Sequence, residues 1–291
     1  MNLDVIYVTY NPNLNFLEQS INSIVRNVRK VYVVDNTPGK AKYLENYASD
    51  KIEVVYLNAN MGIAYAQNVG IKKSIKNGSD YVLLSDQDTI YPEDYLFDML
   101  KSFELSENAI ACVPLFRDIN QKKANEGFIR KYPFGFKKFY PAKGKYEVFQ
   151  AIASGKIISM KLLKKVGFMN EDLFIDWVDL EWCWRAHKKG YKIIGNADVT
   201  ITHQLGDNAK DIGFREVNLR SPFRHYYITR NAFYLSLQSP DLDLLHRAIL
   251  FLKSIRYIIG FPLLSKPHLT HLRYVLLGFF HGIIGKLGEL K

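Results

Sequence analysis

Four short apolar segments in the first 90 residues most constrain what this chain can fold into. They are rich in Val, Ile, Leu and Tyr, as expected of buried strands, and they cover residues 3–10, 31–34, 52–57 and 81–84. Apolar residues at helical spacing over 14–28 and 63–76 predict two amphipathic helices, one between the first two strands and one between the last two. This alternation predicts an α/β fold with a parallel, doubly wound, Rossmann-like central sheet.

Polar residues follow each of these predicted strands. They are Tyr10, Asn11, Asp35, Asn36, Asn60, Gly62, Asp86 and Asp88. Taken singly, each is a common turn or cap residue. Together they predict a ligand site, because parallel strands place their carboxyl ends at one rim, where open α/β sheets bind ligands. The sequence has no G-x-G-x-x-G after the first strand and no Walker-type Gly-Lys-Ser/Thr, which excludes the usual dinucleotide and P-loop sites. We therefore expect a mononucleotide held through its base, its ribose and a metal-bridged diphosphate.

Asp86 and Asp88 directly follow the fourth strand. Two carboxylates at positions i and i+2 suit a divalent cation that is shared with substrate phosphates. The structural alternative is an Asp-rich turn that leads into a helix beginning at Pro92, and both interpretations can hold at once. His203 follows two short strands predicted within residues 191–201. It could complete a cation site or donate to a diphosphate, although a lone His is more often structural.

Residues 171–185 form a second acidic stretch, most of which has the periodicity of an amphipathic helix. Its carboxylates crowd near the predicted helix start, where negative charge is favourable in any case. Glu181 has a structural partner in Arg185 at i,i+4 spacing, whereas Asp179 has none. A carboxylate at a helix start beside a cleft can accept the proton of an incoming hydroxyl, so Asp179 is the candidate general base.

Residues 117–146 are basic, aromatic and without clear periodicity. They predict a long surface loop or hairpin, which in a compact domain is often functional or mobile. Interleaved Lys and aromatic side chains would also suit a stacking platform for single-stranded nucleic acid, so that interpretation stays open here.

With these pieces in place, the sequence resembles the inverting glycosyltransferases of family 2, which have the GT-A fold. It is most similar to the bacterial rhamnosyltransferases that build O-antigens and other surface polysaccharides. The resemblance covers about residues 3–238. Ser85-Asp86-Gln87-Asp88 stands where the family carries its metal-binding Asp-x-Asp, and residues 174–185 match the acidic helix, whose catalytic base falls on Asp179. The segment that begins at His203 and the Tyr-Tyr-x-x-Arg-Asn of residues 226–231 match later motifs.

The nucleotide side of the family is matched by four short motifs. They are Thr9-Tyr10-Asn11, Asp35-Asn36, Asn60-x-Gly62 and Ala66-x-Asn68-x-Gly70. The resemblance implies direct displacement on dTDP-L-rhamnose by a hydroxyl of a glycan or lipid-linked oligosaccharide, with inversion. It implies Mg²⁺ or Mn²⁺ at Asp86, Asp88 and His203, and Arg230 near the leaving phosphates. One alternative is a UDP-hexose donor. Another is a non-catalytic basic protein that binds glycan or nucleic acid; carboxylates at the rim disfavour it, because they repel phosphates unless a cation intervenes.

Composition narrows the setting of this activity. The chain has 291 residues with a formal net charge of +10, which suits an anionic partner. Cys112 and Cys183 lie far apart and offer no disulfide framework, and no signal-peptide pattern or apolar run of about 20 residues is present. We therefore expect a cytoplasmic protein, soluble or peripheral on the inner face of the plasma membrane. Residues 1–238 would form the catalytic domain, with a nucleotide-sugar half (1–115) and an acceptor half (116–238).

The remaining residues, 239–291, predict a basic tail of two amphipathic helices. Residues 240–291 hold seven Lys and Arg against three Asp and Glu, and their apolar runs are interrupted by basic residues. Such helices suit a membrane interface, where lipid-linked acceptors are found. Packing on the catalytic domain, or a homodimer contact, is the alternative.

Overall fold

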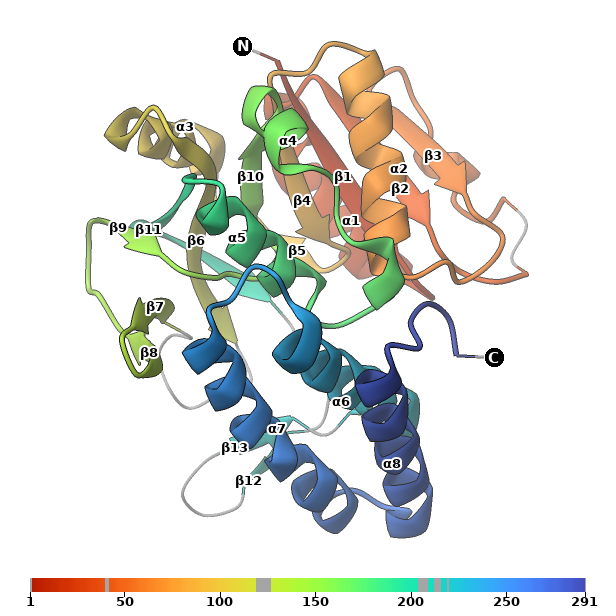
Figure 1. The fold of residues 1–291 in the computed structure, drawn as a ribbon. Coiled ribbons are helices and arrows are strands. Elements are labelled where there is room, and N and C mark those ends of the chain that lie inside the picture. The colour runs from red at the N-terminus through yellow and green to blue at the C-terminus, as the bar shows by residue number, and fades with distance from the viewer. Residues whose placement is uncertain are drawn as a thin grey trace.

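The computed structural model of the protein describes residues 2–39, 42–118, 127–203, 209–211, 216–218 and 220–290. The described part is built around a nine-stranded mixed sheet with strand order β3-β2-β1-β4-β10-β6-β11-β5, and β9 pairs with β11 beside this path (Figure 1). The first four strands are β1 (Leu3–Thr9), β2 (Lys30–Asp35), β3 (Ile52–Tyr56) and β4 (Tyr81–Asp86), all mutually parallel.

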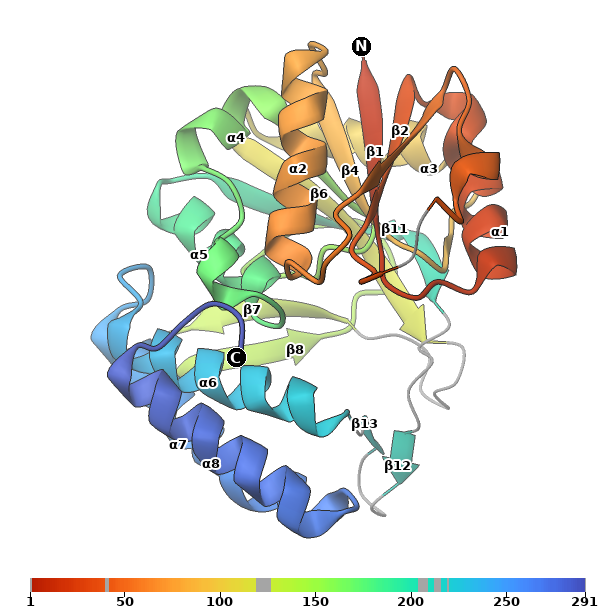
Figure 2. The same cartoon turned by 90° about the vertical axis from the view of Figure 1, so that its right-hand side faces the viewer.

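Helices cover both faces of this parallel part, as the sequence predicts. Helix α1 (Leu14–Ile24) packs on the face that carries Val5 and Tyr7 of β1, and α2 (Ile63–Lys76) packs on the face that carries Ile6. Figure 2 shows the two helices on opposite sides of the sheet. The alternation of side chains along a strand sends neighbouring residues to opposite faces, so both faces of β1 are buried. The doubly wound fold is confirmed.

The second half of the sheet is mixed in direction. Strand β10 (Lys156–Ser159) runs antiparallel to both β4 and β6 (Ala109–Asp118), and β11 (Lys192–His203) runs parallel to β6. The edge strands β5 (Thr89–Ile90) and β9 (Lys145–Val148) are antiparallel to β11. The two short strands predicted within 191–201 are one long strand, β11, with an irregular register between Asn196 and Thr200.

Smaller elements complete the α/β part. Within the region predicted as a loop or hairpin, β7 (Phe128–Tyr132) and β8 (Gly135–Phe139) form a hairpin. The other elements are η1 (Val25–Asn27), η2 (Glu45–Tyr47), α3 (Tyr95–Leu100), η3 (Lys101–Leu105), α4 (Met160–Val166), η4 (Glu171–Leu173), α5 (Val178–Lys188), β12 (Ala209–Asp211) and β13 (Glu216–Asn218).

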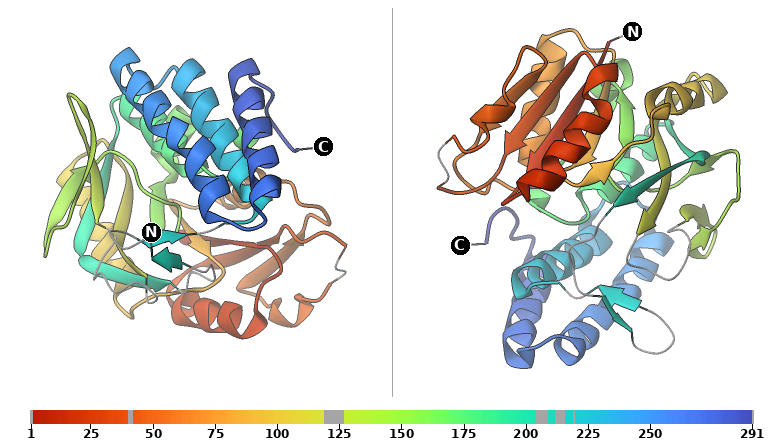
Figure 3. Two further views of the ribbon diagram at one scale, coloured as in Figure 1. Left: turned by 90° about the horizontal axis from the view of Figure 1, so that it is seen from below. Right: turned by 180° about the vertical axis from the view of Figure 1, so that it is seen from behind.

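Three long helices end the chain and pack together as a bundle. Helix α6 (Pro222–Gln238) lies between the α/β part and the pair α7 (Leu244–Leu264) and α8 (His268–Ile284), which form the outer layer (Figures 2 and 3). Glycines allow the close approach of α8 to α6, because a Cβ on Gly278 or Gly282 would lie 2.5 Å from the carbonyl oxygen of Tyr226 or Arg230. None of the helices in the described ranges is long and apolar enough to span a bilayer.

Candidate active site

The strand register brings the predicted polar residues to one rim of the sheet. Thr9 pairs with Asp35 across β1 and β2, and Val8 pairs with Asp86 across β1 and β4. The two carboxylates therefore flank the end of β1. This placement follows directly from three parallel strands of similar length, which is the basis on which the sequence predicted a ligand site here.

Asp35 is the best-organised group at this rim. Its side chain is buried, and its Oδ1 accepts hydrogen bonds from Thr9 Oγ1 (2.9 Å), Thr37 Oγ1 (2.8 Å) and the Tyr43 hydroxyl (2.9 Å). Its Oδ2 is buried as well and has no hydrogen-bond partner among the described residues. One oxygen of the carboxylate is therefore fixed in place while the other can accept a bond from a ligand.

Three asparagines and a tyrosine shape the loops around Asp35. The Asn36 amide donates to Asn60 Oδ1 (2.9 Å) and its oxygen accepts from the Met61 N–H (2.7 Å), so the loops after β2 and β3 are tied together. The Asn11 N–H donates to Thr37 Oγ1 (2.8 Å). Tyr10 is 49% exposed beside this rim, and its ring is free of the core.

The surroundings of Asp86 disfavour its charged form. Burial, and secondly the charge of Asp179, raise the pKa of Asp86 to about 6, against a hydrogen bond from Ser154 and the charge of Arg224, which lower it. A carboxylate whose charged form is opposed by burial and by the charge of a second carboxylate favours proton uptake or the binding of a cation. Carboxylate oxygens are hard ligands of the kind that Mg²⁺ and Mn²⁺ take, so Asp86 fits the role that the sequence suggested.

Asp88 and His203 belong to the edge of the sheet formed by β5 and β11. Asp88 lies in the turn between β4 and β5, and the register of β5 with β11 sets Thr89 opposite His203. The His203 side chain lies outside the described part of the structure. Within that part no three His, Cys, Asp or Glu side chains come together as a metal site.

Asp179 lies in the first turn of α5. The Ala153 N–H donates to its Oδ2 (3.0 Å), while its Oδ1 is buried without a partner among the described residues. Burial raises the pKa of Asp179, and the charge of the buried Lys156 opposes this shift. A carboxylate that is fixed through one oxygen, with a raised pKa and a free second oxygen, has the properties of a general base. Glu181 instead makes the predicted bidentate pair with Arg185 (2.8 and 2.9 Å).

The loop of residues 172–177, here called the α5 entry loop, positions Asp179. Three of its residues have left-handed backbone, Phe174 (φ 63°), Asp176 (φ 63°) and Trp177 (φ 67°). Gly62 supports it from α2, because a Cβ there would lie 2.6 Å from the Phe174 carbonyl oxygen, which accepts a bond from the Ile63 N–H (2.8 Å). Gly62 thus acts by close backbone approach.

Asn68 and Arg230 also support the structure around this loop. The buried Asn68 amide donates to Met169 O (2.9 Å) and Glu171 Oε1 (2.8 Å), so both of its N–H groups are used. Arg230 has 0% exposure and donates to Asn231 Oδ1 and to the carbonyl oxygens of Asp172, Leu173 and Gly288. The Arg230 guanidinium is therefore used inside the fold, and its predicted contact with the leaving phosphates stays a prediction that the structure does not support.

Arg224 is the cationic residue that sequence reasoning missed. It projects from the first turn of α6 and binds Asp176 through two contacts of 2.6 and 2.8 Å, and its charge also acts on Asp86. Asp176 and Arg224 are 48 residues apart in the sequence, so no local spacing predicts that they pair. Asn231 completes the arrangement, since its amide donates to the carbonyl oxygens of Leu173, Ile175 and Asp176 (2.9–3.0 Å).

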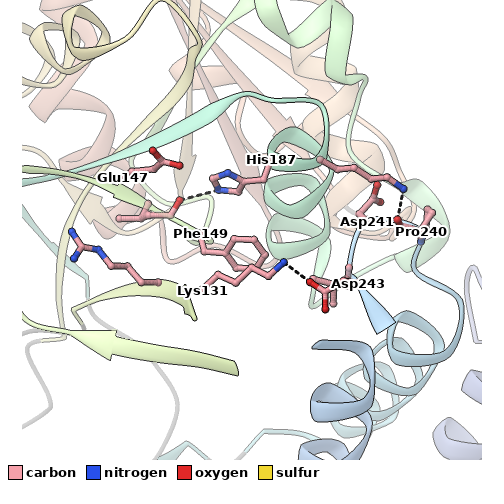
Figure 4. A pocket seen from close by; sticks show the side chains of 11 residues that line it. Lys131, Glu147, Phe149, His187, Pro240, Asp241 and Asp243 are labelled. Atoms are coloured by element: carbon pink, nitrogen blue, oxygen red, sulfur yellow. Dashed lines mark hydrogen bonds and ion pairs between the residues drawn. The ribbon is translucent and has the colours of Figure 1, made fainter. Parts of the chain in front are cut away.

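A separate cavity of about 720 Å³ lies at the other end of α5 (Figure 4). None of the predicted site residues lines it. Two of its polar side chains are paired: Lys131 binds Asp243 (2.6 Å), and His187 binds the Val148 carbonyl (2.9 Å) and stacks on Phe149. The cavity joins the β7–β8 hairpin to the start of α7, away from the carboxylates.

This fold is that of the GT-A glycosyltransferases, as solved structures show. S. aureus TarS (residues 1–349, in complex with UDP-GlcNAc) superposes with a TM-score of 0.59 at 18% identity, covering 97% of this chain and 82% of that one. GalNAc-T7, solved with UDP, GalNAc and Mn²⁺, gives a TM-score of 0.60 at 14% identity over 88% of this chain, which spans only 55% of the GalNAc-T7 chain.

The sequence comparisons define the family. The model of Glycosyl transferase family 2 matches residues 4–167. The chain is also 31% identical over 236 residues to the dTDP-rhamnosyl transferase RfbF of Shigella flexneri, covering 80% of this chain and 79% of that protein. The protein belongs to glycosyltransferase family 2 and is a glycosyltransferase.

Proposed function

We propose that this enzyme transfers L-rhamnose from dTDP-L-rhamnose to a hydroxyl of a bacterial surface glycan, with inversion at the anomeric carbon. The observation that carries the proposal is the carboxylate of Asp179, whose Oδ1 is buried without a hydrogen-bond partner among the described residues and whose charge acts on Asp86. Similarity to RfbF favours rhamnose as the sugar, and RfbF covers most of this chain.

Asp35 is the candidate contact for the nucleobase. Its free Oδ2 can accept the imide N–H that thymine and uracil both present. Because this contact is common to the two bases, Asp35 selects a pyrimidine of this kind without separating dTDP from UDP. The exposed Tyr10 ring is available to stack on the base. A UDP-hexose donor is the alternative that this geometry also accommodates.

The reaction needs charge at the diphosphate and a base at the acceptor. Mg²⁺ or Mn²⁺ would be held by Asp86 and Asp88, with His203 as a further ligand, and would supply positive charge to the leaving diphosphate. Arg224 adds a fixed cation on the side of α6. Asp179 takes the proton of the acceptor hydroxyl. The oxygen of that hydroxyl attacks the anomeric carbon from the face opposite the diphosphate, which leaves.

Stabilisation by nucleotides tests the donor assignment. In a thermal-shift experiment with dTDP and UDP, we expect dTDP to raise the Tm with Mn²⁺ and to do so much less with EDTA. Asp35→Asn should lose most of this shift, whereas Asn15→Asp, an exposed position at the start of α1, should keep it. A larger shift of the Tm with UDP than with dTDP would indicate a UDP-sugar donor in place of dTDP-L-rhamnose. An equal shift without metal would reassign Asp86 and Asp88 to direct contacts.

Turnover tests the base. Asp179→Asn should leave the dTDP-induced shift nearly intact and lower the rate of transfer by about 10²–10⁴-fold. Full activity of this variant would remove Asp179 from the mechanism while leaving the donor assignment untouched.

A further inference from the structure

Helices α7 and α8 carry apolar side chains that face solvent. On α7, Leu252, Ile259 and Leu263 are 65%, 61% and 68% exposed, and on α8, Leu269, Leu276 and Phe280 are 81%, 47% and 57% exposed. Their spacing places each set on one side of its helix. The opposite sides, with residues such as Leu250 and Val275, are buried. We call the exposed apolar surface of this helix pair the outer face.

Charge identifies what the outer face can bind. Residues 244–288 contain six Lys and Arg and no Asp or Glu, and Lys253, Arg256, Lys266 and Arg273 are exposed. A second copy of the chain, docked on the same face by a two-fold axis, would bring these cations against one another. An anionic lipid surface would take up the apolar side chains and pair with the cations at the same time.

The outer face also ends close to the active site. His225 of α6 bonds through Nδ1 to His271 Nδ1 (2.8 Å) and stacks on Phe261, with ring centroids 3.9 Å apart. These contacts place the turn between α7 and α8 at the same end of α6 as Arg224, which binds Asp176 in the α5 entry loop. Leu263 and Leu269 flank Lys266 at this turn.

We propose that the outer face is an interfacial docking surface for an anionic phospholipid bilayer. The helices would lie in the headgroup region, with the α7–α8 turn inserted and the catalytic cleft held at the height of a lipid-linked acceptor. The docking itself stands apart from the proposed donor and base; only the identity of the acceptor as a lipid-linked glycan rests on the proposed function.

Vesicle flotation of the full-length protein tests the docking. We expect it to float with vesicles of phosphatidylcholine mixed with phosphatidylglycerol, and much less with phosphatidylcholine alone or at high salt. Leu263→Glu and Leu269→Glu should each lower the partition coefficient by about tenfold. Lys266→Glu combined with Arg273→Glu should remove the preference for the anionic lipid. Leu105→Glu is the matched control, since Leu105 is 55% exposed at the end of η3, and it should float like the unmodified protein.

The dTDP-induced thermal shift separates this proposal from the proposed function. Variants of the outer face should retain that shift, which also shows that they fold. Failure of the unmodified protein to float, or flotation unchanged in the leucine variants, would overturn the docking surface. So would a concentration-dependent dimer, measured by light scattering, that the same leucine substitutions dissociate.

Discussion

Arg230→Met separates two roles for this residue, a clamp inside the fold and a ligand of the leaving phosphates. Met keeps much of the aliphatic stem but removes every donor of a side chain with 0% exposure. Asp172 O keeps a bond from the Gly288 N–H, and Leu173 O keeps one from the Asn231 amide. Among the described residues, therefore, two acceptors lose their single donor, Gly288 O and Asn231 Oδ1.

The magnitude follows from these bonds. Each orphaned acceptor costs about 1–3 kcal/mol, and the lost bonds to Asp172 O and Leu173 O add to that cost. Removing a buried cation recovers part of the sum, because the guanidinium no longer has to be desolvated. We expect a net loss of about 2–4 kcal/mol in the free energy of unfolding, and a Tm lower by about 3–7 °C for a chain of this length.

The assay combines the Tm of the ligand-free protein with the affinity for dTDP and Mn²⁺, measured well below that Tm. Arg230→Met should lower the Tm and leave the affinity within a few-fold. Arg224→Met provides the comparison: its side chain is 31% exposed, so the loss of stability should be smaller, while transfer should fall because Asp176 and Asp86 lose a counter-charge. An unchanged Tm with weakened dTDP binding in Arg230→Met would refute the clamp and restore the phosphate contact.

Two further predictions concern the helix bundle. Burial, followed by the charges of His271, Arg220 and Arg224, lowers the pKa of His225 to about 4 in the folded protein. In the unfolded chain the pKa of this histidine is near 6.5. The free energy of unfolding should therefore fall as the pH is lowered from 6.5 to 4, by up to about 1.4 kcal/mol per pH unit. His225→Phe should show a smaller drop in Tm between pH 7.5 and pH 5, and an unchanged drop would contradict the assignment. Gly278→Ala should destabilise the protein by about 1–3 kcal/mol, because the new Cβ meets Tyr226 O at 2.5 Å. Gly260→Ala, where nothing lies within 4 Å of the new Cβ, should stabilise α7 by about 0.5–1 kcal/mol, and equal effects in denaturant unfolding would argue against the α6–α8 contact.

The parallel half of the sheet could be predicted because its signal is local. Each of β1 to β4 is an apolar run that ends in polar residues, and α1 and α2 show their periodicity within a dozen residues. Strand β10 was missed because it has only four residues and because its two antiparallel partners, β4 and β6, are far away in the sequence. The long β11 was split because a register irregularity interrupts its pattern between Asn196 and Thr200.

The site shows the same division. Asp35 and Asp86 could be placed together from the strand order alone, since parallel strands fix where their ends meet. The role of Arg230 could not, because a motif records which residue is present and does not record what it is buried against. The pairing of Asp176 with Arg224 depends on the packing of α6 across the α5 entry loop, a contact that appears only once the tertiary structure exists.

The α5 entry loop explains why the terminal helices matter to the chemistry. Its left-handed residues would not hold this shape alone, since each such position is unfavourable for a side chain larger than glycine. Asn231 and Arg230 bond its carbonyl oxygens from α6, and Gly62 with Ile63 supports it from α2. Helix α6 is in turn fixed by α8, through the close approach at Gly278 and Gly282. The position of Asp179 against the sheet rim therefore depends on a continuous set of contacts that extends from the nucleotide half to α8, so a displacement of α8 would be transmitted through α6 to the candidate base.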